Sequence, residues 1–499
     1  MAEKLPEQES IVYQDRRYVG TKETMAYLLF DASQEFNINA YEDRFIFDVL
    51  KIDLDKLSII KAINSVWDII NDVFSGILVD KTRTRWGKFK PYLIALAIPG
   101  TILTTLFWAT PVFFDDNPDN MAKFFAWLAL AILREGVGTF QGIAKTGLLA
   151  TITPHPVDRT RLMMKNQLIG GLFGSQIPEI LMGLLIDLVN HKVITAFSLK
   201  GTFVTMGLFT SVVAGLVSLY AFINMRERVV QSVDRPSLME GIRSIINNKP
   251  ILLYTMAEFL GAFSLNAGIN NYYIDVLGSA SIKNIVGIPG GFFATASYAY
   301  VPWARRKFST KTLWIVGSMW GEFLMALVFF VGSIGGRGPE GWYRQPSKMI
   351  PTIMAQETIW MTVFGIRRII PQEMLNEAMD YCEWKNGYRT EGMTSIARGL
   401  ASKLVKNVST SIRPALMKMF GYDLKAGFGE QSDRTKYALF ALCTIIPFVT
   451  SLLSIIPKLM YDLTGRKREL MYEELLVRRE AKQKELSDHQ AALEGAQES

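Results

Sequence analysis

Residues 64–92 read NSVWDIINDVFSGILVDKTRTRWGKFKPY, an apolar run that carries two acids and ends in a dense basic turn. Asp68 and Asp72 are four residues apart, so a helix would place them on one face, with Asn71 beside them. A carboxylate at bilayer depth is costly unless a partner neutralises it, so such a pair marks a candidate functional site. Oxygen ligands of this kind suit a small alkali cation. The alternative is that a Lys or Arg from a neighbouring helix pairs with both acids.

The composition is that of a protein that crosses a membrane many times. The chain has 499 residues, of which 49% are hydrophobic, and a mean hydropathy of +0.17. A helix needs roughly 20 apolar residues to span a bilayer, and uncharged, single-acid and amphipathic runs together give about twelve spans. These runs are 91–114, 201–224, 284–303 and 437–457; 168–186, 251–274, 312–332 and 349–366; and 22–48, 57–79, 121–150 and 393–419.

The runs predict an all-α membrane protein, because lipid admits only helices or closed barrels and these runs are too long for barrel strands. The polar stretch 224–250 divides them six and six. We therefore expect twelve transmembrane helices in two six-helix halves, the arrangement of the major facilitator fold, with the substrate site near the midplane between the halves. The expected units are a first half at 1–225, a cytoplasmic linker at 226–249, a second half at 250–460 and a charged cytoplasmic tail at 461–499.

The charge pattern predicts the orientation in the membrane. Basic clusters fall in alternate loops, which the positive-inside tendency places in the cytoplasm, and an even number of spans puts both termini there. We expect a multi-pass protein of the cell membrane, which in a bacterium is the inner membrane. The first residues are charged and lack the apolar core of a cleavable signal peptide. The net charge of +7 is explained by loop Lys and Arg, without nucleic acid, and two cysteines imply no disulfide framework.

Three motifs resemble one transporter family. The run from Trp67 to Tyr92 is similar to a signature of the glycoside-pentoside-hexuronide:cation symporter family. The segment MDYCEWKNGYRTEG at 379–392 resembles that family's loop before the eleventh span, and ERVV at 227–230 with NKP at 248–250 is a weaker match. The resemblance implies a monomeric secondary transporter in the lipid bilayer that couples Na⁺ or H⁺ to uptake of a sugar, glycoside or sugar acid by alternating access, without a cofactor.

The same resemblance implies a coupling-cation site. In the family, this site is formed by the paired acids of the second span, the Asn between them and a Thr of the fourth span. These correspond here to Asp68, Asn71, Asp72 and Thr139. Four oxygen-bearing side chains, two of them formally negative, suit Na⁺ and could also accept a proton. No metal beyond the transported cation is expected.

The sugar side matches the family less well. The family's sugar-binding Asp and Trp of the fourth span fall at Gly142 and Thr146, so a carboxylate and a stacking ring are missing. Asp31 is the nearest match to the sugar-binding acid of the first span. These departures argue against a melibiose-like substrate. The candidate substrate residues are Asp31, Glu35, Arg134, Gly142, Lys145, Thr146 and Lys403.

Cations near the expected cavity suggest an acidic substrate. Arg134 and Lys145 are eleven residues apart, so a helix brings them to nearly the same face. Lys403 lies in the eleventh span. If these cations face a midplane cavity, they would favour an anionic sugar such as a hexuronide. The alternative is that Arg134 pairs with Glu135 or with an acid of the first span.

The basic turn after the second span is a candidate cytoplasmic gate. Its candidate residues are Asp80, Arg83, Arg85, Trp86 and Lys88. The turn carries one acid and five cations, so its ion pairs could latch the two halves and break in the inward-open state. A cluster that only fixes the topology would look similar.

Other function classes stay open. An uncoupled facilitator would not need the acid pair, and a carrier of a lipid-like or other anionic solute would need an apolar cleft that lipid can reach. An enzyme is not expected, because the chain has three His and neither a nucleophile elbow nor a phosphate-binding loop. Four acids inside the predicted spans have no assigned role: Glu179, Glu258, Glu322 and Glu357.

Overall fold

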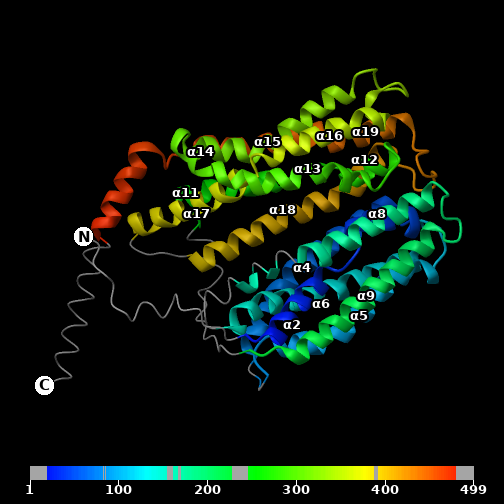
Figure 1. The fold of residues 1–499 in the computed structure, drawn as a ribbon, viewed down its shortest axis with the longest axis horizontal. Helices are drawn as coiled ribbons and strands as arrows, with labels where there is room; N and C mark the ends of the chain where they lie inside the picture. The colour runs from blue at the N-terminus through cyan, green and yellow to red at the C-terminus, as the bar shows by residue number, and fades with distance from the viewer. Residues whose placement is uncertain are drawn as a thin grey trace.

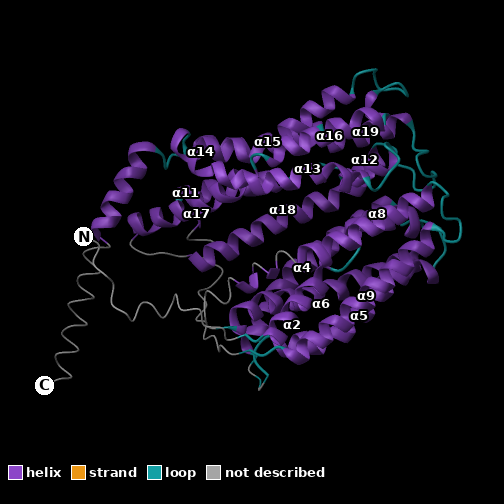
Figure 2. Cartoon of the chain, in the orientation of Figure 1, coloured by secondary structure: helices purple, strands orange, loops and turns teal. Residues whose placement is uncertain are grey.

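The part of the chain that the structure, a computed structural model, describes is helical and contains no β-strand (Figure 2). The described residues are 19–82, 84, 86–153, 161–163, 165–166, 170–227, 245–386 and 391–478. The helices form two bundles that lie side by side, one coloured blue to green and the other green to red (Figure 1). They meet where α4 (Leu54–Lys81) of the first bundle packs against α18 (Glu391–Met419) of the second.

The first bundle contains the six spans expected from the sequence. Its first span is built from four short pieces: α2 (Thr21–Glu35), η2 (Asn39–Tyr41), α3 (Glu42–Arg44) and η3 (Phe45–Leu50). The other five are α4, α5 (Lys90–Phe113), α6 (Met121–Ile152), η4 (Gly170–Gln176) with α8 (Ile177–Asn190), and α9 (Leu199–Asn224).

The second bundle adds six more spans, so the predicted twelve-helix fold is confirmed. They are α11 (Lys249–Ala262) with α12 (Ile269–Asp275); α13 (Ile282–Ala296) with η5 (Ser297–Tyr300) and α14 (Val301–Lys307); α15 (Thr310–Gly332); α16 (Pro346–Met361) with α17 (Phe364–Asn386); α18; and α19 (Asp433–Cys443) with α20 (Ile445–Ser451), η7 (Leu452–Ser454) and α21 (Ile455–Met460). The short turn η6 (Trp342–Arg344) precedes α16, and a helix at 465–478 follows the last span. The unit boundaries given above stay predictions.

Side-chain caps start several of these helices. Asp53 accepts from the backbone N–H groups of residues 55 and 56 at the start of α4, and Asn120 caps α6 in the same way. Ser198, Asn248 and Ser309 cap α9, α11 and α15. Each cap satisfies donors that the helix itself leaves free, and polar residues at these positions therefore mark where the chain enters a span.

Apolar side chains on the outside of the bundles are exposed, as a lipid-facing surface requires. Ile98, Leu216, Ile223 and Phe292 are each at least 60% exposed. Five described helical stretches are individually long and apolar enough to cross a membrane: Leu54–Val79, Lys90–Phe113, Leu199–Asn224, Thr310–Gly332 and Asp433–Met460. The other spans contain charges or breaks, which lipid tolerates where they face protein or a cavity.

The first span of each half is interrupted in its second part. In the first half the helix stops at Phe36 and resumes through the turn at Asn39; in the second half it stops at Phe263 and resumes after Gly268, whose φ is +82°. Interrupted spans at matching positions of two repeats mark the ligand region in transporters of this architecture. Both breaks lie in the part of the molecule where the two bundles touch, which places the candidate site at the junction.

Candidate functional site

The acid pair of α4 holds a lysine from the other bundle. Lys403 Nζ, on α18, lies 2.6 Å from Asp68 Oδ1 and 2.6 Å from Asp72 Oδ2. Asn407, one turn along α18, donates its amide to Asp68 Oδ2 at 3.1 Å. The Asp68 side chain is 7% exposed, while the other two members of this ion cluster are 26% and 35% exposed. The ammonium group thus occupies the position expected for a cation, which is the alternative arrangement raised from the sequence.

Two hydrogen bonds fix α4 against α6 beside this cluster. Trp67 donates its indole N–H to the carbonyl of Ile132 at 3.1 Å, and Asn71 donates its amide to the carbonyl of Glu135 at 3.5 Å. Asn71 is buried, and its amide N–H is used in this packing contact. The structure therefore brings Asn71 next to the acid pair, with its nitrogen turned toward α6.

The place of Thr139 in a cation site stays a prediction. Thr139 lies half-buried on α6, and among the described residues no hydrogen bond connects it to Asp68 or Asp72. One turn earlier, Glu135 lines the same cavity as Asp68. From the sequence, Glu135 is expected to pair with the adjacent Arg134. Only the packing of α4 on α6 shows that it lies near Asp68.

A cavity of about 360 Å³ opens beside the ion cluster and takes its lining from both bundles. Its size falls within the range of small-molecule sites, about 300–1,000 Å³. Amides and hydroxyls in the wall are suitable hydrogen-bond partners for sugar hydroxyls, and two aromatic rings add flat apolar surface. Apart from the ion cluster, the lining that sequence reasoning missed includes Glu42, Lys61, Asn64, Ser65, Phe107, Trp127, Glu135, Asn407 and Thr410.

Three of the candidate substrate residues of the first and fourth spans form one ion cluster. Lys145 Nζ on α6 lies 2.9 Å from Asp31 Oδ1 and 3.1 Å from Glu35 Oε1, both on α2. Asp31 is buried and Glu35 is half-exposed. Gly142 is exposed, and the side chain of Thr146 lies outside the described residues. Asp31, Glu35, Gly142 and Lys145 do not line the cavity beside Lys403.

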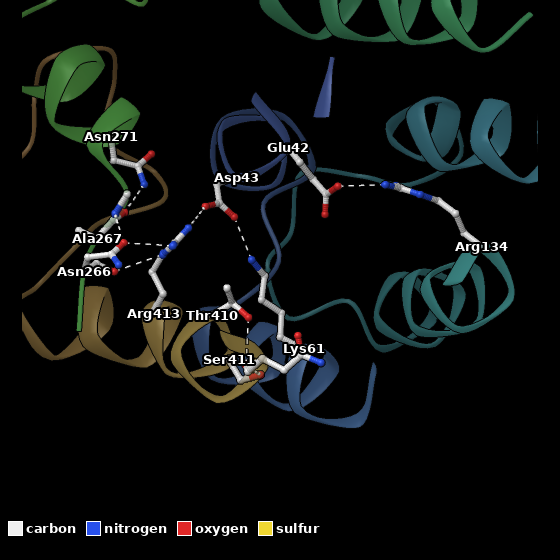
Figure 3. Close-up of polar contacts among 12 residues, drawn as sticks. Glu42, Asp43, Lys61, Arg134, Asn266, Ala267, Asn271, Thr410, Ser411 and Arg413 are labelled. Atoms are coloured by element: carbon white, nitrogen blue, oxygen red, sulfur yellow. Dashed lines mark hydrogen bonds and ion pairs between the residues drawn. The ribbon is translucent and has the colours of Figure 1, made fainter. Parts of the chain in front are cut away.

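Arg134 is also paired, with an acid that follows the break in the first span. Its Nη2 lies 3.2 Å from Glu42 Oε2, and its guanidinium stacks 3.9 Å from the ring centre of Phe107. Figure 3 shows the Glu42–Arg134 contact from α3 to α6. Arg134, Lys145 and Lys403 each have carboxylate partners in the part of the chain that the structure describes, so these three cations do not form the expected field of free positive charge. The structure has the alternative arrangement, in which these cations are neutralised.

The basic turn contacts the start of the linker. The backbone N–H groups of Lys88, Phe89 and Lys90 donate to the Glu227 carboxylate at 2.8, 2.9 and 2.6 Å. This is an anion held by the free donors at the N-terminus of α5. Trp86 is exposed; the side chain of Asp80, and all of Arg83 and Arg85, lie outside the described residues. The described contacts tie the turn to the linker, and its role as a gate between the halves stays a prediction.

A buried ion cluster joins the halves near the two helix breaks, and nothing in the sequence indicated it. Arg44, on α3, forms ion pairs with Asp48 at 2.7 Å and with Asp275 of α12 at 2.6 Å. Tyr422 donates its hydroxyl to Asp275 at 3.0 Å. We call the part of the molecule that contains this cluster and the loops 51–53, 276–281 and 333–345 the Arg44 end.

A second junction lies beside it. The Asp43 carboxylate accepts from Lys61 of α4 at 2.9 Å and from Arg413 of α18 at 2.6 Å (Figure 3). Arg413 also donates to the side chain and the carbonyl of Asn266, in the unwound segment between α11 and α12, at 3.1 and 3.2 Å. Arg413 thus links the two interrupted spans, so a movement at one break changes the contacts of the other.

Two six-helix bundles with an ion cluster and a polar cavity at their junction are the architecture of a membrane transporter. A family model described as MFS/sugar transport protein matches residues 24–465. The chain belongs to this family, and the resemblance to glycoside-pentoside-hexuronide:cation symporters is confirmed by its relatives. It is accordingly a transporter and not an enzyme.

Two relatives and one solved structure illustrate the match. The chain is 22% identical to the isoprimeverose transporter of Lactiplantibacillus pentosus, over 91% of this chain and 90% of that protein. It is 23% identical to the glucuronide carrier protein homolog of Escherichia coli K12, over 85% and 88%. The crystal structure of the D-xylose-proton symporter superposes with a TM-score of 0.53 at 14% identity, covering 91% and 97%, which shows the shared fold.

Proposed function

We propose that the protein is a symporter that moves a neutral sugar or glycoside, together with Na⁺ or H⁺, through the cavity beside Lys403. The observation that carries the proposal is the position of the Lys403 ammonium between Asp68 and Asp72 at the wall of that cavity. A lysine that is attached to one half and bound by acids of the other makes the relative position of the halves depend on what the acids bind.

The coupling follows from competition for the same oxygens. A cation that enters between Asp68 and Asp72 displaces the Lys403 ammonium, which weakens a contact between α4 and α18. A proton on either acid has the same effect, because it removes the charge that holds the lysine. Closure around a substrate then depends on whether the acid pair is occupied, which is the requirement for symport.

The charges of the cavity favour a neutral substrate over a uronide. Its wall carries the acids Glu42, Asp68 and Glu135 and the cations Lys61 and Lys403, so it has no excess positive charge. The amides and hydroxyls of the wall suit a neutral sugar. Isoprimeverose and a glucuronide, suggested by the names of the two relatives, are therefore the informative pair of substrates to compare.

The test is uptake by proteoliposomes with and without an inward Na⁺ gradient, at two values of pH, for wild type and Asp72→Asn. We expect cation-stimulated uptake of isoprimeverose that is lost in Asp72→Asn and retained in the control Asp116→Asn, an exposed loop acid. Equal uptake in all conditions would instead indicate an uncoupled facilitator. Failure to move either sugar would indicate a carrier of a non-sugar solute.

A further inference from the structure

A second, larger cavity lies between α8 of the first bundle and α13, α15 and α16 of the second. Its volume is about 1260 Å³. Most of its wall is apolar and includes Tyr273, Met325, Trp360, Phe364 and Pro447. It shares no lining residue with the cavity beside Lys403 in the part of the chain that is described. The proposed symport therefore leaves this space without a role.

Three of the four glutamates that had no assigned role lie in the wall of this cavity. Glu179 is paired with Lys283. Glu322, on α15, and Glu357, on α16, make no hydrogen bond and no ion pair with any described residue. Two charged carboxylates without a protein partner in a largely apolar wall are costly.

The cations nearest to these two acids are held by other groups. Lys458 Nζ, which attracts Glu322 at longer range, donates to Ser318 at 2.7 Å and to Ser454 at 2.8 Å. Arg367, which attracts Glu357, holds its guanidinium 4.9 Å from the ring centre of Trp360. The described residues thus supply weak compensation for the two acids and leave their oxygens without a direct partner.

Uncharged polar groups in the same wall are also without partners. Gln356 is 8% exposed, lies one residue before Glu357, and forms no hydrogen bond within the described residues. Asn284 Nδ2 and Ser281 Oγ are buried and unpaired as well. Buried amides are nearly always hydrogen-bonded, so the unpaired Gln356 amide in the cavity wall points to a ligand.

We propose that this cavity binds an apolar organic cation, at a site distinct from the symport cavity. The apolar wall accommodates a hydrophobic body, and the ring of Tyr273 offers a face for a positive charge. Glu322 and Glu357 supply the countercharge. A lipid acyl chain would fill the same space but would leave both acids and Gln356 unpaired, and an organic anion would be repelled.

The test is equilibrium dialysis of the purified full-length protein in neutral detergent with labelled tetraphenylphosphonium. Tetraphenylborate, which has the same shape and the opposite charge, is the matched probe. We expect the phosphonium to bind wild type and the borate to bind at least about tenfold more weakly. The double variant Glu322→Gln, Glu357→Gln is expected to lose at least about tenfold in phosphonium affinity, while Glu340→Gln, an exposed loop acid, binds as wild type does.

A second variant tests the site without touching the acids. A Cβ added at Gly291, a residue of the cavity wall, would meet no atom within 4 Å, so Gly291→Leu is expected to fill part of the cavity and weaken binding. Equal affinity for the two probes, unchanged binding in the double variant, or loss of binding in Asp72→Asn would each overturn the proposal. Because dialysis needs no transport, its outcome is separate from that of the uptake experiment.

Discussion

Arg44 and Asp275 form a two-bond ion pair that is buried between the two halves. Nη1 lies 2.6 Å from Oδ2 and Nη2 lies 2.9 Å from Oδ1, and the two side chains are 3% and 4% exposed. A forked pair of this kind is both strong and specific in geometry. It joins α3, directly after the break in the first span, to α12, directly after the break in the seventh. The pair therefore stabilises the conformation in which the halves are in contact at this end.

We expect Asp275→Asn to favour conformations that are open at the Arg44 end. The substitution removes the forked partner of Arg44 and leaves Asp48 as its remaining ion-pair partner, so the cost falls below the about 3–5 kcal/mol of an uncompensated buried charge. Part of this cost falls on the closed conformation alone and shifts the population toward the open one. The measurement is the labelling rate of Ser65→Cys, in the wall of the symport cavity, by an impermeant maleimide added at the Arg44 end. The rate should rise at least about tenfold.

The control for this prediction is an ion pair in the loops of the same end. Lys56 and Asp119 lie 2.9 Å apart, but Asp119 is 78% exposed and both residues belong to the first half. Exposed pairs contribute about 0–1 kcal/mol, so Asp119→Asn should leave the labelling rate unchanged. A rate that stays at the wild-type value in Asp275→Asn would show that the buried pair does not control closure.

Lys403→Gln should lower stability without Na⁺ and raise the stabilisation that Na⁺ provides. The substitution leaves Asp68 and Asp72 facing each other without a cation, which we expect to cost about 3 kcal/mol. A Na⁺ ion then binds without having to displace an ammonium group, so its affinity rises. The measurement is the thermal unfolding midpoint in detergent across a series of NaCl concentrations, with choline chloride to hold the ionic strength constant.

Lys406→Gln is the matched control, because Lys406 lies one turn from Lys403 on the same helix and is exposed. Its midpoint should follow that of wild type at every concentration. A Lys403→Gln midpoint that does not respond to NaCl would mean that the acid pair is not a Na⁺ site and would leave the proton as the coupling ion.

The sequence was sufficient for the fold and for one side of the ion cluster. Apolar runs of bilayer length fix the spans, and the spacing of Asp68 and Asp72 places both acids on one face of α4. The sequence could not identify Lys403 as the partner of these acids, because Lys403 lies 335 residues from Asp68. Spacing along the chain gives no information on the distance between two helices. The same limit applies to Arg44 and Asp275, which are 231 residues apart.

The substrate residues were less predictable, for a different physical reason. A register taken from a family signature assigns positions along a helix, but neighbouring charges decide which way a long side chain points. Lys145 is drawn to Asp31 and Glu35, and Arg134 is drawn to Glu42, a residue beyond the break in the first span. A break at the sequence Phe36-Asn-Ile-Asn39 would have been a usable signal, since it moves Glu42 onto a new helical segment.

Lys145→Gln is expected to leave the ratio of isoprimeverose uptake to glucuronide uptake unchanged. The Lys145 ammonium is neutralised by two carboxylates and does not line the symport cavity, so it contributes little field there. The total rate should fall, because Asp31 and Glu35 lose their partner and α2 is held less firmly against α6. Uptake of both labelled sugars by the same vesicles gives the ratio directly. A selective loss of glucuronide uptake would restore the hypothesis of a cationic cavity.

Gly87→Ala should detach the basic turn from the linker, whereas Gly76→Ala should not. Gly87 has φ of +111°, which an L side chain rarely adopts, and its new methyl group would overlap the Glu227 carboxylate. We expect faster trypsin cleavage within 81–90 and slower uptake. A methyl group at Gly76 meets no atom within 4 Å and adds helix propensity, about 1 kcal/mol. Equal cleavage rates in the two variants would show that the contact between Glu227 and the turn does not hold this loop.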